Sequence, residues 1–112
     1  MVILKALTGT IGKFPFLRLH ILLTREDGVV VARCLDFSVS SHGGTEEGAL
    51  NSLSDSIIDY LNHATEHGAL DEIVDPDDDR LWETFRKLEL QNEQRMSLIE
   101  NKVFSGLYDT TA

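Results

Sequence analysis

Residues 25–61, REDGVVVARCLDFSVSSHGGTEEGALNSLSDSIIDYL, decide the fold of this chain. Within this stretch, Asp27-Gly28 tolerates the positive φ angles that a two-residue hairpin turn requires. Residues 29–35 are apolar and rich in β-branched side chains, and residues 37–41 alternate apolar with polar. Both patterns are typical of strands. The stretch therefore predicts a turn, two successive strands and, beyond Gly43-Gly44, a change of structure.

A long helix is predicted after the two glycines. Thr45 is a good N-cap, and Glu46 and Glu47 place negative charge at the positive end of the helix dipole. Gly68 is a natural residue for the C-terminal stop. Between these signals, apolar residues recur at helical spacing and predict one buried face. The residues of this face are Ala49, Leu50, Leu53, Ile57, Tyr60, Leu61 and Ala64.

A half-buried strand precedes the hairpin turn. Residues 16–24, FLRLHILLT, alternate so that four aliphatic side chains share one face. These four are Leu17, Leu19, Ile21 and Leu23. We expect Leu53, Ile57 and Leu61 of the helix to fill the core against this sheet. The sheet residues expected opposite them are Leu19, Ile21, Val31 and Val39.

The chain after the first helix carries weaker patterns. Residues 69–74, ALDEIV, are short and apolar enough for a fourth strand. Asp75 is expected to cap a second helix, with Pro76 at its first position and an end near Met96. The apolar stripe of this helix is thin and consists of Leu81, Trp82, Phe85 and Leu88.

Together these elements predict a single α+β domain over residues 1–112. A small antiparallel sheet of three to four strands carries one long helix, in the order β-β-β-α-β, and a C-terminal helix follows. The core is expected over about residues 16–75 and a helical extension over about 76–112. Residues 2–7 are predicted to form an extra strand or to pair with a neighbour. The apolar tail 103–108 suggests docking on another surface.

The charge of the chain is distributed unevenly. The formal net charge is −9. Residues 1–44 carry five Lys/Arg against three Asp/Glu, whereas residues 45–112 carry five against sixteen. An acidic surface repels nucleic acid and attracts basic proteins, although charge also serves general solubility. Duplex DNA is therefore not an expected partner, and a basic protein is.

The compartment is predicted from cysteine usage and hydropathy. A single cysteine, Cys34, excludes a disulfide framework and favours a reducing compartment. The first residues carry no signal-peptide pattern, and no segment reaches the ~18 apolar residues that a membrane span needs. We therefore expect a cytoplasmic protein.

The order of these motifs resembles the HicB-like antitoxin family of small proteins. The shared pattern is an Asp-Gly turn, a strand that ends in Cys, a short strand, and a helix opened by Gly-x-Thr. Its counterparts here are Asp27-Gly28, Cys34, residues 37–41, Gly43-Gly44-Thr45, Glu46-Glu47-Gly48-Ala49-Leu50 and Tyr60-Leu61. Leu35, His42 and Gly48 stand where the family commonly has Pro, Gln and Glu.

The resemblance implies a degenerate ribonuclease-H-like core and a role in neutralising a small basic ribonuclease toxin. Many relatives carry a C-terminal DNA-binding helix-turn-helix or ribbon-helix-helix, and neither is evident here. The candidate partner-binding residues are Trp82, Phe85, Glu46, Glu47, Asp77 and Asp78. The two aromatic residues also fit core packing, and the four acids also fit solvated helix starts.

No catalytic or cofactor-binding residue is predicted. A metal nuclease with this kind of core needs carboxylates clustered on adjacent strands. The strand over residues 17–24 has none, and the next strand has only Asp36 at its end. Cys34 lies among apolar strand residues, which is typical of core packing. As a nucleophile it would need a base beside it, such as His20 or His42.

Two further groups resemble metal ligands. Four carboxylates suit a hard cation, but the spacing lacks the later Gly and Glu of a calcium loop. These four are Asp75, Asp77, Asp78 and Asp79, which fit a capped helix start better than a cation site. His63 and His67 stand four residues apart without an evident third ligand. We therefore predict no metal site.

Three functions remain open at this point. The leading one is a non-enzymatic antitoxin that covers the RNA-binding surface of a basic toxin. The second is a stand-alone oligomeric scaffold or small-ligand-binding protein of the same fold. The third is an enzyme with residual hydrolase chemistry. A homo-oligomer is expected because a sheet with one covered face leaves open edges and a second face.

Overall fold

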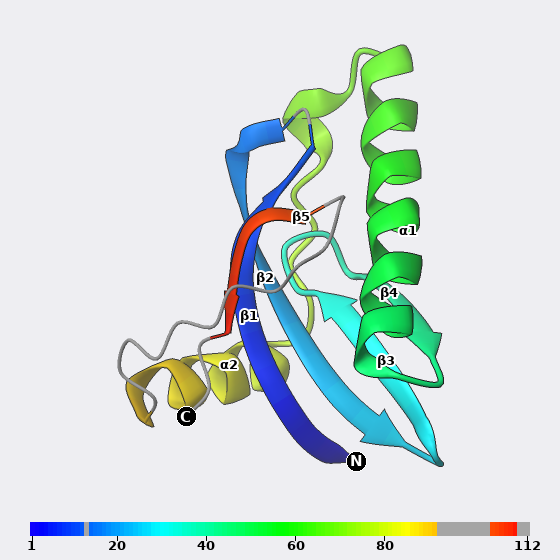
Figure 1. Cartoon of the computed structure of the whole chain (residues 1–112). Helices are drawn as coiled ribbons and strands as arrows, with labels where there is room; N and C mark the ends of the chain where they lie inside the picture. Colours follow the sequence, from blue (N-terminus) through cyan, green and yellow to red (C-terminus); the bar gives the residue numbers. More distant parts are fainter. Residues whose placement is uncertain (13, 92–103, 110–112) are drawn as a thin grey trace.

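The computed structural model describes residues 1–12, 14–91 and 104–109. Its five strands are β1 (Val2–Ile11), β2 (Phe14–Glu26), β3 (Val29–Cys34), β4 (Val39–Gly43) and β5 (Phe104–Asp109). Its helices are α1 (Glu46–Glu66) and α2 (Asp79–Gln91), with the 3-10 helix η1 (Leu70–Glu72) between them. The strands form one antiparallel sheet in the order β4-β3-β2-β1-β5 (Figure 1). The predicted α+β class, with a long helix on the sheet and a second helix after it, is confirmed.

The hairpin turn between β2 and β3 forms as the sequence predicts. Asp27 and Gly28 have φ angles of 52° and 76°. Two consecutive positive φ angles define the tight turn that matches the twist of antiparallel strands. β2 and β3 consequently pair without a register shift from the turn to Cys34.

The start of α1 is fixed by two local contacts. The Thr45 hydroxyl accepts a hydrogen bond from the Gly48 backbone N–H at 3.0 Å, which confirms the predicted cap. At Gly43 an added Cβ would lie 2.6 Å from the backbone nitrogen of Ala49. Only glycine therefore lets the end of β4 approach the first turn of α1 this closely.

The main core lies between α1 and the sheet. Leu53, Ile57 and Leu61 are fully buried there, together with Leu19 and Ile21. Val39 is partly buried and packs against the same cluster. These contacts confirm the predicted buried face of the helix.

The prediction that Val31 faces this core is wrong. Val31 pairs with Thr24 on the opposite face of the sheet, and Val30 is buried in the core instead. Because paired residues share a face, the pairing of Leu23 with Ala32 fixes the phase of β3. Three consecutive valines show no alternation, so the sequence does not indicate which of them faces the α1 core.

α2 covers part of the second face of the sheet. Phe85 is fully buried there against Ala6, Leu22 and Leu35. Leu22 lies between Ile21 and Leu23, whose side chains belong to the α1 core. β2 is therefore buried on both faces, as an inner strand between two helical layers should be.

Residues 69–74 do not form the predicted fourth strand. η1 lies there, and the Tyr60 hydroxyl donates a hydrogen bond to the Ile73 carbonyl at 2.7 Å. Gly68 has a φ of 65° and turns the chain away from α1 without extending it. Ile73 is buried in the α1 core, whereas Leu70 and Val74 are exposed.

Two element boundaries also differ from the predictions. α2 begins at Asp79 because the Asp78 carboxylate, rather than Asp75, accepts from the Arg80 backbone N–H at 2.8 Å. The predicted helix end near residue 96 lies outside the described residues. β4 begins at Val39, two residues later than predicted, because Ser38 has a φ of 56° within a turn.

β1 lies outside the predicted core of residues 16–75, yet it pairs with β2 along most of its length. The extra strand predicted over residues 2–7 is present and extends to Ile11. On its other side β1 pairs with β5, so residues 104–108 of the predicted docking tail form a strand of the same sheet. Residue 103 lies outside the described part of the chain.

We predict that Leu53→Ala lowers the free energy of unfolding by ~2–5 kcal/mol, because it leaves a cavity in the α1 core. Urea denaturation followed by circular dichroism measures this change. Asp55→Ala, on the exposed side of the same helix, should change it by less than ~0.5 kcal/mol. An unmoved midpoint for Leu53→Ala would contradict the described packing.

Candidate functional site

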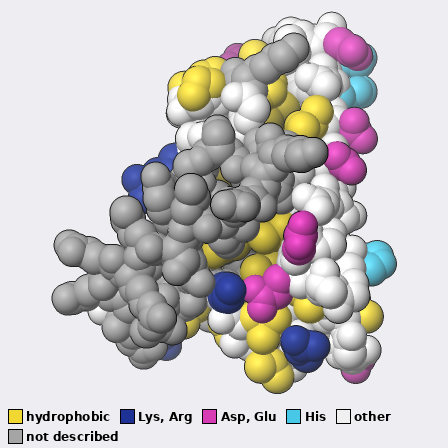
Figure 2. Space-filling view, in the orientation of Figure 1, with side chains coloured by type: hydrophobic (Ala, Val, Ile, Leu, Met, Phe, Trp, Pro, Cys, Tyr) yellow, Lys and Arg dark blue, Asp and Glu magenta, His cyan; other side chains and the backbone are white. Residues whose placement is uncertain are grey.

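The most distinctive surface of the molecule is the outer face of α1. The 21 residues of this helix include five Asp or Glu and no Lys or Arg. Four of these acids are exposed, and we call them the α1 acidic face. They are Glu47, Asp55, Asp59 and Glu66. Figure 2 shows Asp and Glu side chains along the right-hand edge, where α1 lies in Figure 1.

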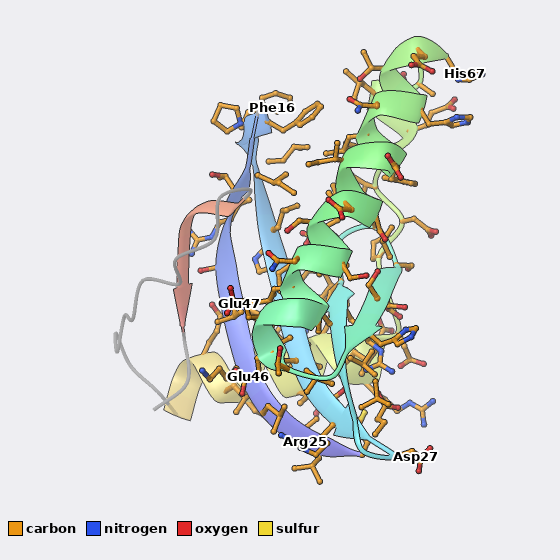
Figure 3. The ribbon with its side chains drawn as sticks, turned by 45° about the vertical axis from the view of Figure 1, so that its right-hand side comes forward. Phe16, Arg25, Asp27, Glu46, Glu47 and His67 are labelled. Atoms are coloured by element: carbon orange, nitrogen blue, oxygen red, sulfur yellow. The ribbon has the colours of Figure 1, made fainter. Side chains whose placement is uncertain are left out.

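The fifth acid, Glu46, is engaged by a neighbouring strand. Its carboxylate lies 3.1 Å from the Lys5 ammonium on β1. Figure 3 shows Glu46 and Glu47 together at the first turn of α1, with His67 at its other end. Within the described residues, no Lys or Arg lies within 4 Å of the α1 acidic face. This charge is therefore available to a partner.

The other predicted acids lie elsewhere on the molecule. Asp77 and Asp78 precede α2, which packs on the sheet face opposite α1. The Asp77 backbone N–H donates to the Leu35 carbonyl at 2.8 Å. Hydrogen bonds from the Arg80 side chain and backbone lower the pKa of the Asp78 carboxyl. These acids organise the start of α2, and they do not join Glu46 and Glu47 in one surface.

The two predicted aromatic residues lie against the sheet. Phe85 has no exposed surface, so it cannot contact a partner protein. Trp82 is partly buried and packs against the same cluster. Their rings meet the His20 ring at centroid distances of 5.3 and 5.1 Å. Their evident role is to dock α2, which corrects the expectation for Phe85 in particular.

A polar cluster is built around His20, whose ring packs against these two rings. The Asp36 carboxylate accepts from the His20 backbone N–H at 2.7 Å and lies 2.9 Å from His20 Nδ1. It also accepts from the Cys34 thiol at 3.7 Å. One carboxylate thus ties the centre of β2 to the end of β3, beneath α2.

The chemistry open to this cluster is limited. A carboxylate on Nδ1 leaves Nε2 as a proton acceptor, which is the arrangement of a general base and its orienting group. A nucleophile needs a thiolate, but burial raises the pKa of the Cys34 thiol well above its usual range, and the nearby Asp36 charge adds to this. The thiol therefore stays protonated. The cluster is best understood as a structural clamp on α2.

A second polar cluster lies on the same face of the sheet. The Arg33 guanidinium donates to the Glu26 carboxylate at 2.8 Å and to the Thr24 hydroxyl at 2.9 Å. The Arg33 hydrogen bond is the main cause of a lowered pKa at Glu26, and the Thr24 hydroxyl adds to it. The acid on β2 is thus neutralised by the cation on β3, and neither charge is available elsewhere.

The two groups that resemble metal ligands in the sequence occupy separate places. His63 and His67 lie at the end of α1 with ring centroids 4.2 Å apart, and His67 Nδ1 lies 2.8 Å from the His63 carbonyl. Among the residues whose side chains the structure describes, no three His, Cys, Asp or Glu are grouped to hold a metal ion. No helix in this part of the chain is both long and apolar enough to cross a membrane.

No protein-family model matches the chain at a significant level, and neither does any curated protein or solved structure. Of the α1 acidic face, only Glu47 was among the predicted partner-binding residues. The helical spacing of Asp55, Asp59 and Glu66 on a helix without Lys or Arg is the signal that could have found the others. The His20–Asp36 pair was not accessible to sequence reasoning, since its members are 16 residues apart and meet only through the pairing of β2 with β3.

We predict that Asp36→Ala lowers the free energy of unfolding by ~1–3 kcal/mol, because it leaves His20 donors without a partner. The loss should be visible in the fluorescence of Trp82, the one tryptophan of the chain, whose ring packs on His20. Asp59→Ala is the matched control on an exposed surface. Identical denaturation curves for the two variants would contradict the clamp.

We also predict that Cys34 does not react with a thiol reagent in the folded protein and reacts at once in urea. The side chain is fully buried and its pKa is raised by burial, so the thiolate is absent at neutral pH. Asn62→Cys introduces a thiol at an exposed position of α1 and should react rapidly without denaturant. Equal rates for the two thiols in native buffer would refute the prediction.

Proposed function

We propose that this protein is a non-enzymatic binding protein that neutralises a small basic ribonuclease, as its resemblance to HicB-like antitoxins implies. The observation that carries the proposal is the α1 acidic face, an exposed row of carboxylates on a helix without lysine or arginine. The surface with which a ribonuclease holds RNA is basic, because it must contact phosphates. An acidic helix face complements such a surface and excludes RNA from it.

The physics favours a fast and salt-sensitive encounter. Unpaired surface charges raise the association rate of an oppositely charged partner, and salt screens this long-range attraction. The charges of Asp55 and Asp59 sit one helical turn apart on a rigid scaffold, so no loop has to be ordered on binding. A reducing cytoplasm suits this assignment, since the buried Cys34 is unpaired.

The proposal assigns no catalytic residue. Each carboxylate near the central strands already has a partner: Glu26 is held by Arg33, and Asp36 is held by His20. A two-metal nuclease would need such groups free and clustered. The alternative of a stand-alone oligomeric scaffold or small-ligand binder is favoured by the open edge of β4, and it would make no use of the α1 acidic face.

We predict that the purified protein binds a small basic ribonuclease encoded in an adjacent reading frame and blocks its RNA cleavage. Asp55→Asn/Asp59→Asn should slow association by about threefold to tenfold at low salt and change dissociation less. Glu83→Gln/Glu89→Gln removes the same charge from exposed positions on α2 and is the matched control. Stopped-flow fluorescence over a salt series measures both rates.

If both double variants slowed association equally, the slowing would be due to net charge. The α1 acidic face would then not be the binding surface. The protein itself should show no affinity for generic duplex DNA at low salt and no RNA cleavage with magnesium or manganese. Metal-dependent cleavage that Asp36→Asn abolishes would replace the binding function with the nuclease alternative.

A further inference from the structure

The outer edge of the sheet at β4 is open. β4 is the terminal strand of the sheet and is bonded to β3 on one side only. Its five residues, Val39–Gly43, include no Lys, Asp, Glu or Pro. Soluble proteins usually protect such an edge with a charge, a proline or a bulge, because its free N–H and C=O groups can template another strand. β4 has none of these protections.

The pairing pattern shows which main-chain groups face outward. The Leu35 N–H donates to the His20 carbonyl at 2.9 Å, so residues 29, 31, 33 and 35 direct their main-chain groups toward β2. The alternate residues of β3 therefore bond to β4, where their partners are Val39, Ser41 and Gly43. The N–H and C=O groups of Ser40 and His42 consequently point away from the sheet, and among the described residues they meet no hydrogen-bond partner.

This edge is complementary to itself. The two outward-facing residues, Ser40 and His42, lie on either side of Ser41. A two-fold axis perpendicular to the sheet, between the Ser41 residues of two copies, therefore sets these outward-facing residues opposite each other. Ser40 of one copy then lies opposite His42 of the second, and the reverse pair forms as well. Each such pair exchanges two hydrogen bonds in an antiparallel ladder, so all four open groups of each edge are satisfied.

We propose that a second copy of this chain pairs along β4, antiparallel and in the register that sets Ser40 opposite His42. The contact extends the sheet across a two-fold axis and places both α1 helices on the same face. The side chains at the seam, Ser40 and His42, are exposed and carry no carboxylate, so they oppose no like charges in this register. This interface is independent of any basic partner.

Two double variants test both the edge and its register. Ser40→Lys/His42→Lys sets lysine opposite lysine twice across the axis and should weaken dimerisation by about tenfold or more. Ser40→Lys/His42→Glu sets lysine opposite glutamate twice and should keep the dimer. Both variants change the same two exposed side chains. Sedimentation velocity gives the dimer dissociation constants, and thermal unfolding shows whether each variant is folded.

A third variant removes hydrogen-bond donors alone. Ser40→Pro/His42→Pro deletes the two outward N–H groups and leaves the bonds of β4 to β3 in place, so it should yield a folded monomer.

Because both copies carry an acidic α1, dimerisation of the wild type should strengthen as salt rises, whereas binding of a basic partner should weaken.

Several results would overturn the proposal. One is a wild-type monomer at high micromolar concentration. Another is equal dissociation constants for the Lys/Lys and Lys/Glu variants, which would place the interface elsewhere or in another register. A third is growth into open polymers, which would indicate head-to-tail contacts in place of a closed two-fold pair.

Discussion

The burial of β2 on both faces is the constraint on which the rest of the structure depends. Leu19, Ile21 and Leu23 face α1, while Leu22 and the His20 ring face α2. A strand buried on both sides needs a neighbour on each edge and a helical layer on each face. β1 and β3 supply the edges, and α1 and α2 supply the layers. Every surface considered for function is consequently an outer surface of this arrangement.

The parts of the fold that were predictable are those set by local chemistry. Asp27-Gly28 makes its turn through positive φ, and Thr45 caps α1 through its own hydroxyl. The parts that were not predictable depend on distant pairing. Val31 cannot be assigned a face within a run of valines until β3 is aligned with β2. β1 is obscured because register shifts interrupt its alternation.

The same division applies to the functional surfaces. Composition and helical period within one segment could have identified the α1 acidic face, although only its member Glu47 was predicted to bind a partner. The roles of Trp82 and Phe85 depended on whether α2 meets the sheet, and the structure places both rings on His20. A thin apolar stripe is equally suited to a core and to an interface, so sequence alone left both readings open. The partner of that stripe is the chain itself.

The two proposed surfaces influence each other through charge. A β4–β4 pair sets two acidic helices on one face of a continuous sheet, and their mutual repulsion opposes dimerisation at low salt. A basic protein bound to either α1 acidic face neutralises part of that charge and removes part of the repulsion. Under the two proposals, partner binding would therefore favour the dimer, and by thermodynamic reciprocity the dimer would bind a basic partner more tightly than the monomer. No conformational change is needed for this coupling, because the change in electrostatic free energy between the two helices is sufficient.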